Sequence, residues 1–247
     1  MSEETKTEKP EKIGFNLPKE AVWMTFCGRQ RSGKSYAIRH IIQETMKSDD
    51  PYEFGIVFVK TKFNGDYNYI DDKYVRDDFT VQALHRHIKN MEDWTKTHNN
   101  QMQGKNFIIL DDLQGLRDPN DPLMKSIVST FRHTNTHFFI SAQYLNVGTS
   151  TSERECSNYA FMFNTGSQRT MKSWYQYFGQ VCDSEKEFIA VLKDVTSDAE
   201  NHEALLFVQG APTKRESYFS WKAGENDDDF KVVFARDRKE EEKKQQQ

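Results

Sequence analysis

Several features that would assign this 247-residue chain to a familiar class are scarce or missing. It has only three cysteines, Cys27, Cys156 and Cys182, and their odd number and uneven spacing favour reduced thiols over a disulfide framework. No run of about 18 apolar residues is present, so we expect no membrane span. Residues 1–12 lack an apolar stretch and are not a signal peptide. These absences together predict a soluble protein of a cytosol-like compartment.

A dominant charge is also missing. The formal net charge is −4, of which residues 1–12 contribute −1 (four acids, three bases) and residues 225–247 contribute −2 (eight acids, six bases). The middle of the chain is therefore nearly neutral and has no wholesale basic face. Contact with nucleic acid would have to come from local loops.

The composition of the chain, 36% hydrophobic and 29% charged, is typical of a globular protein with polar ends. We expect a disordered arm over residues 1–12, one domain over 13–224, and a charged, flexible tail over 225–247. Strand and helix patterns alternate along the domain, which predicts an α/β fold. Predicted strands cover 21–27, 53–60, 106–112, 137–143 and 159–163; predicted helices cover 35–46, 81–94, 123–131, 167–178 and 184–192; 61–79 is a predicted loop, and 204–208 with 216–221 form a predicted hairpin.

The most specific motif is the stretch from Gly28 to Ser35, which fits G-x-x-x-x-G-K-[ST], the phosphate-binding P-loop. It follows a predicted strand and precedes a predicted helix, as the motif requires. Backbone N–H groups at such a helix N-terminus cradle a polyphosphate. We therefore expect a mainly parallel P-loop NTPase sheet of the RecA-like (ASCE) type, with helices on both faces. The predicted nucleotide-binding residues are Gly28, Arg29, Gln30, Arg31, Ser32, Gly33, Lys34 and Ser35.

Later strand ends carry residues that hydrolysis of ATP needs. Lys34 can reach the β- and γ-phosphates, while Ser35 and Asp111 suit Mg²⁺ ligation. Asp112 is placed to polarise the attacking water, and Gln143 could hydrogen-bond the γ-phosphate and that water. Taken alone, the acid pair could mark a strand-to-loop transition or a helix cap, and Gln143 a solvated strand end. The P-loop favours the catalytic interpretation.

For the other candidate residues, the sequence favours structural roles over catalytic or binding roles. His85 and His87 fall on the polar face of a predicted helix, so we expect surface residues rather than a metal pair. Cys156 has no paired base nearby in sequence and is expected to be inert. The aromatic residues Tyr67, Tyr69 and Tyr74 could stack on bases, but filling a small core of their own loop is favoured.

The ordered motifs resemble those of the FtsK–HerA superfamily of DNA-pumping ATPases, and within it the poxvirus-type genome-packaging ATPases of large DNA viruses. The resemblance spans residues 20–220 and depends most on the spacing from Arg132 to Gln143. It implies that Arg132, before the fourth strand, and Arg154, before the fifth, are catalytic basic residues. Many members carry Asp-Glu where this chain has Asp111-Asp112, so the shorter Asp112 must come closer to the attacking water to act as its base.

The sequence allows more than one interpretation of the arginines. Arg132 could be a finger supplied to a neighbouring subunit, because it is far in sequence from the P-loop, or a cation at a helix C-terminus. Arg29 and Arg31 could add to the anion site, contact the next subunit, or be exposed to solvent.

The leading hypothesis is a magnesium-dependent ATPase that forms a homo-oligomeric ring and pumps double-stranded DNA into a preformed viral capsid. A capsid vertex protein is a candidate partner, and host cytoplasm, a viral factory or the virion are the expected locations. Two alternatives remain, a nucleotide kinase and a nucleotide-gated scaffold with little turnover. The kinase is weaker because Arg76 is the only arginine in the 61–79 loop, where a lid would lie.

Overall fold

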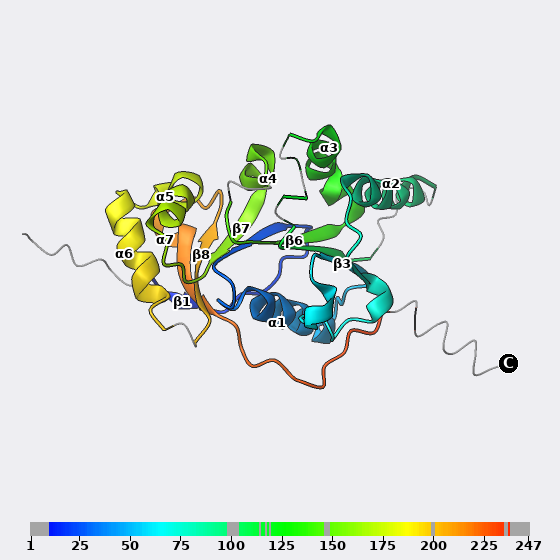
Figure 1. Ribbon diagram of the computed structural model, residues 1–247, viewed down its shortest axis with the longest axis horizontal. Coiled ribbons are helices and arrows are strands. Elements are labelled where there is room, and N and C mark those ends of the chain that lie inside the picture. Colours follow the sequence, from blue (N-terminus) through cyan, green and yellow to red (C-terminus); the bar gives the residue numbers. More distant parts are fainter. Residues whose placement is uncertain are drawn as a thin grey trace, which may run out of the picture.

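The computed structural model describes residues 10–97, 104–113, 115–116, 118, 120–145, 149–198, 201–234 and 237. These residues form one sheet with helices on both faces (Figure 1). Its strands are β1 (Lys12–Ile13), β2 (Trp23–Cys27), β3 (Phe54–Val59), β4 (Val75–Arg76), β5 (Asn106–Asp111), β6 (Thr136–Ala142), β7 (Ser157–Met162), β8 (Glu203–Val208) and β9 (Tyr218–Lys222).

The strands are ordered β1-β9-β8-β7-β2-β6-β5-β3-β4. Strand β2 is central and pairs in parallel with both β6 and β7, while β5 joins β6 to β3 in the same direction. Within the described residues only β8 runs against its neighbours, in antiparallel pairs with β7 and β9. The predicted, mainly parallel sheet and the late hairpin are both confirmed.

The helices divide between the two faces of the sheet. Helix α1 (Lys34–Lys47) covers one face, and Figure 1 shows α2 to α6 on the other. Side chains of β2 alternate accordingly: Met24 and Phe26 join the α1 cluster, whereas Trp23 packs in a cluster with α2 and α3. The remaining helices are α2 (Val81–Thr97), α3 (Pro122–Thr130), α4 (Thr151–Glu155), α5 (Gln168–Tyr177), α6 (Glu185–Val195) and the short α7 (Lys214–Ser217) between β8 and β9.

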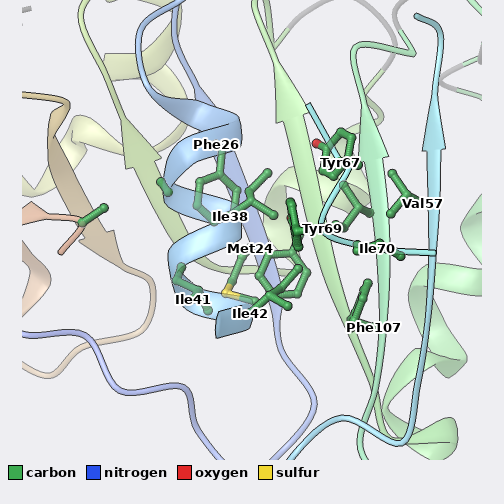
Figure 2. Close-up of a cluster of buried hydrophobic side chains, with 14 of the residues drawn as sticks. Met24, Phe26, Ile38, Ile41, Ile42, Val57, Tyr67, Tyr69, Ile70 and Phe107 are labelled. Atoms are coloured by element: carbon green, nitrogen blue, oxygen red, sulfur yellow. The ribbon is translucent and has the colours of Figure 1, made fainter. Parts of the chain in front are cut away.

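The segment predicted as a loop over 61–79 is more ordered than expected. It contains two 3₁₀ turns and the short strand β4, which pairs with β3. Tyr67, Tyr69 and Ile70 are buried in the main core beside α1, as Figure 2 shows. The preference for core tyrosines is confirmed, but they join the core of the whole domain rather than one of their own.

The boundaries expected at residues 12 and 225 do not match the packed chain. Near the first, β1 pairs with β9, and the Ser220 amide donates to the Glu11 carbonyl at 2.9 Å. After the second, Val232 and Phe234 are buried, and the Val232 amide donates to the Tyr69 carbonyl at 2.7 Å. The alternating apolar pattern of 230–234 was hidden by the acidic run before it. Residues 1–9, 235–236 and 238–247 lie outside the described residues.

All three cysteines are free thiols, and Cys27 and Cys182 are buried. In the described part of the chain, no helix combines the length and apolar character needed to cross a membrane.

Candidate active site

The parallel strands bring three chemically distinct segments to one edge of the sheet. The P-loop leaves the carboxyl end of β2, Asp111 ends β5, and Gln143 follows β6. Cys27 is in register with Ala142, and Asp111 with Ser141, so these strand ends are neighbours. A backbone hydrogen bond of 3.3 Å from Gly28 to Ala142 ties the start of the P-loop to the strand that leads into Gln143. Ligands of open α/β sheets bind at this edge.

The P-loop has a backbone conformation suited to anions. Arg31 and Gly33 have φ angles of 61° and 103°, and α1 begins at the next residue with its free N–H groups. A Cβ on Gly28 would overlap the side chain of Ser32 and lie 2.8 Å from that of Phe163. The Ser32 hydroxyl is buried without a hydrogen-bond partner among the described residues. These features fit the predicted phosphate cradle.

Lys34 lies folded back across the loop. Its Nζ donates to the carbonyls of Gly28 and Arg29, both at 2.9 Å. Burial lowers the pKa of Lys34, and the nearby carboxylates of Asp111 and Asp112 oppose that shift. The ammonium therefore lies within electrostatic reach of the acid pair, and a bound phosphate would compete with the two carbonyls for it.

Asp111 is the buried acid of the site, with 7% of its surface exposed. Burial raises the pKa of its carboxyl group, while the Ser141 and Tyr67 hydroxyls and the Lys34 ammonium act in the opposite direction. Neither hydroxyl makes a hydrogen bond of ordinary geometry among the described residues. A buried carboxylate whose pKa is raised in spite of these neighbours fits a residue that can hold a cation.

Asp112 differs from its neighbour in exposure and backbone. It is exposed, its φ is 49°, and its amide donates to the Ser141 carbonyl at 3.2 Å. A left-handed conformation in a residue other than glycine is uncommon and costs energy, although aspartate tolerates it better than most. The turn directs the chain away from the sheet immediately after the buried acid.

Oxygen ligands of the kind that Mg²⁺ prefers are present beside the P-loop. Asp111 supplies a buried carboxylate, and Ser35, half-buried in the first turn of α1, supplies a hydroxyl. Gln143 is half-buried one residue beyond β6. Lys34, Ser35, Asp111, Asp112 and Gln143 thus lie at one edge of the sheet.

Arg132 lies at the opposite edge. It is exposed in the 3₁₀ turn Phe131–Thr134, which precedes the amino end of β6. Since β6 has seven residues, about 20 Å separate this turn from the P-loop edge, more than an arginine side chain spans. Arg132 therefore cannot act on a phosphate held by the P-loop of its own chain.

Arg154 is also outside the gathered set. Its guanidinium donates to the carbonyls of Thr149 at 2.6 Å and Leu145 at 3.3 Å, and it lies 4.2 Å from the centre of the Tyr177 ring. These contacts fix the connection between β6 and β7. The predicted catalytic role of Arg154 stays a prediction.

The remaining candidates divide between the loop surface and the helices. Arg29, Gln30 and Arg31 are exposed on the P-loop.

On α2, His87 is half-buried with its ring 5.4 Å from that of Phe54, and burial lowers its pKa. Among the described residues, no three or more histidine, cysteine or acidic side chains are grouped so that they could hold a metal ion. Cys156 is half-buried and burial raises the pKa of its thiol, which favours the inert interpretation.

Three residues of this edge were missed by the sequence interpretation of the site. Tyr67 and Ser141 approach Asp111, and His202 packs on Gly33. Ser141 is two residues from the end of the predicted strand 137–143, so its position near a strand end was a usable signal. Tyr67 and His202 come from connections whose course depends on the whole fold, and no motif marks them.

No family model and no curated protein matches this sequence. Solved structures do match. The genome packaging NTPase B204 of Sulfolobus turreted icosahedral virus 2 in complex with AMPPCP is 13% identical, with a TM-score of 0.57 over 84% of this chain and 100% of that one. The cytoplasmic domain of the type VII secretion ATPase EccC of Thermomonospora curvata is 15% identical, with a TM-score of 0.56 over 88% of this chain and 27% of that one.

EssC (ATPases 2 and 3) of Geobacillus thermodenitrificans is 10% identical, with a TM-score of 0.54 over 92% of this chain and 44% of that one. At these identities the likeness concerns the fold. The chain has the P-loop NTPase fold that it shares with a viral packaging NTPase and with secretion ATPases, in agreement with the FtsK–HerA resemblance of its motifs.

Proposed function

We propose that this chain is a magnesium-dependent ATPase that works as a homo-oligomeric ring and drives double-stranded DNA into a viral capsid. The observation that carries the proposal is the convergence of Lys34, Asp111, Asp112 and Gln143 around one P-loop. The fold likeness to a viral genome packaging NTPase supports the choice among P-loop functions. The same proposal places the protein in host cytoplasm, in a viral factory or in the virion. It also includes contact with a capsid vertex protein.

The proposed chemistry divides among the residues at this edge. The P-loop amides bind the phosphates, and Lys34 leaves its two carbonyl partners for the β- and γ-phosphates. Ser35 and Asp111 would hold Mg²⁺, which neutralises charge that develops on the phosphates. Asp112 orients and deprotonates the attacking water, and Gln143 hydrogen-bonds that water and the γ-phosphate. Each assignment can be tested by one substitution.

An oligomer follows from the position of Arg132 if this residue is catalytic. It cannot reach its own P-loop, but it is exposed at an edge of the sheet where a second subunit can dock. A finger supplied by a neighbour stabilises charge at the γ-phosphate and couples hydrolysis to subunit contact. The distance within one chain thus supports action between subunits over action within one.

The direct test measures the rate of ATP hydrolysis with and without double-stranded DNA over a range of protein concentrations. DNA stimulation with a steep dependence on concentration is expected of a ring motor. Lys34→Ala should abolish ATP binding or turnover, and Asp112→Asn should leave ATP bound but unhydrolysed. Asp77→Asn, an exposed acid in the 61–79 loop, is the matched control. Turnover that ignores DNA, or phosphate transfer to a nucleotide, would contradict the proposal.

The finger is tested by mixing two inactive variants. Arg132→Ala subunits keep an intact P-loop edge, and Asp112→Asn subunits keep an intact arginine, so mixed rings should recover part of the activity. Absence of recovery at every mixing ratio would count against the trans finger while leaving the ATPase assignment intact. The same experiment with Arg154→Ala distinguishes the two arginines.

A further inference from the structure

A second set of side chains lies on the other side of the P-loop from the acid pair. Strands β7, β8 and β9 follow β2 in this direction, whereas β6 and β5 lie in the opposite one. Because β8 runs antiparallel to β7, its first residue lies at the same edge as the carboxyl ends of the parallel strands. His202, immediately before β8, and residues 223–226, immediately after β9, therefore reach the P-loop and the start of α1.

His202 is packed directly on the P-loop. A Cβ built on Gly33 would lie 2.7 Å from the Cβ and 2.9 Å from the Nδ1 of His202, so the imidazole occupies the space that any other residue at position 33 would need. The φ angle of His202 is 49°, a left-handed conformation that is uncommon outside glycine. Strained backbone of this kind is concentrated at functional sites.

The imidazole also carries an unsatisfied polar atom. Nδ1 of His202 is shielded from solvent and has no hydrogen-bond partner among the described residues. The ring lies 5.5 Å from that of Tyr36, the residue that follows the P-loop serine. Buried polar atoms are rarely left unpaired without a reason, and a bound ligand is one such reason.

Tyr36 is held firmly although it is partly exposed. Its hydroxyl donates to the Gly224 carbonyl at 3.0 Å and accepts from the Asn226 amide at 3.2 Å. Asn226 also donates through its side chain to the Tyr36 carbonyl at 3.1 Å. The segment after β9 thus fixes the ring of Tyr36, and an immobilised ring loses little entropy when a planar group packs on it.

We propose that His202 and Tyr36 form the nucleoside side of the nucleotide site, a proposal that rests on the nucleotide binding argued above. Asp111, Asp112 and Gln143 define the γ-phosphate side of the P-loop, and the amides at the start of α1 bind the α- and β-phosphates. The α-phosphate and its nucleoside then leave toward β7 and β8. There the base packs on the aromatic pair, and the His202 ring turns so that its Nδ1, shielded beside Gly33 in this structure, hydrogen-bonds the nucleoside.

The test compares a nucleotide with its bare phosphate chain. Calorimetry measures the Kd of AMPPCP and of inorganic tripolyphosphate, each with Mg²⁺, for the parent, His202→Ala and His202→Asn. His202→Ala should raise the Kd of AMPPCP about fivefold to tenfold, the loss of one hydrogen bond and a ring contact, and that of tripolyphosphate less than about twofold. Asparagine tolerates the left-handed backbone and supplies an amide, so His202→Asn should recover most of the affinity for AMPPCP.

Two controls make the outcomes distinct. His133→Ala removes an exposed histidine at the far edge of the sheet and should change neither Kd. Lys34→Ala should weaken both ligands. Equal weakening of AMPPCP and tripolyphosphate by His202→Ala would overturn the proposal, because His202 would then act through the shape of the P-loop. An unchanged Kd for AMPPCP would overturn it too. A parent protein that binds neither ligand would refute nucleotide binding itself, and this inference with it.

Discussion

The buried carboxylate of Asp111 leads to a prediction about stability with a defined sign. The residue is 7% exposed, and burial raises the pKa of its carboxyl group although the Ser141 and Tyr67 hydroxyls and Lys34 oppose that shift, so its negative charge is not fully compensated when no cation is bound. Asp111→Asn keeps the size and removes the charge. Burying an ion is costlier than burying an amide, so we expect the free energy of unfolding to rise by about 1–2 kcal/mol at pH 7.5 without nucleotide or magnesium. For a domain of this size the melting temperature should rise by about 2–8 °C.

The dependence on pH follows from the direction of the pKa shift. Burial raises the folded-state pKa of Asp111 above its ordinary value of 3.8, so the native state binds this proton more readily than the unfolded state. The cost of the carboxylate is therefore present at neutral pH and is relieved as the pH falls through the raised pKa. The advantage of Asp111→Asn should be complete at pH 7.5 and should disappear by the ordinary aspartate pKa.

Thermal unfolding across pH, with and without magnesium and AMPPCP, measures both effects. Asp112→Asn is the control, because that acid is exposed and its replacement should change the melting temperature little. Magnesium with AMPPCP should stabilise the parent more than Asp111→Asn, which lacks the carboxylate that would hold the cation. A lower melting temperature of ligand-free Asp111→Asn at pH 7.5 would refute the reasoning, since Lys34 would then compensate the charge fully.

Three further substitutions test other parts of the structure. Phe234→Ala should lower the free energy of unfolding by about 3 kcal/mol in urea titrations, because Phe234 is 1% exposed, while Val233→Ala, which is 39% exposed, should change it by less than about 0.5 kcal/mol. Burial lowers the pKa of His137 to about 3, so the free energy of unfolding should fall by up to about 1.4 kcal/mol per pH unit below pH 6.5. His137→Phe should remove this loss of stability, which is measured from the midpoints of urea titrations at several pH values. Gly33→Ala should weaken AMPPCP binding in calorimetry, and adding His202→Ala should not restore it fully, because the φ of 103° stays unfavourable for alanine.

Much of the sheet could be predicted from the sequence because its parallel strands are buried on both faces. Such strands are near-continuous apolar runs, and those of β2, β5 and β6 stand out against the polar connections. The short strands β1 and β4 could not be found in this way. Each has two residues, and its pairing depends on a partner that only the folded sheet supplies.

The residues of the candidate site also differ in how far the sequence predicts their positions. Lys34 closes the loop that follows β2, Asp111 ends β5 and Gln143 directly follows β6, so topology alone brought them together. The place of Arg132 at the opposite edge followed from the direction of β6, but a role between subunits depends on a second chain. His202 depends on the antiparallel direction of β8, which no local pattern reveals.

The central place of β2 has a consequence for synthesis on the ribosome. It precedes the other long strands that the structure describes, and both of its partners come much later: β6 ends at Ala142 and β7 at Met162. At about 5–20 residues per second, the stretch between the end of β2 and the end of β7 takes roughly 7–27 s to make. Until β6 has been made, the nascent chain holds an apolar strand with neither of its sheet neighbours. A chaperone that binds extended apolar segments would therefore find its target in β2, directly before the phosphate-binding loop.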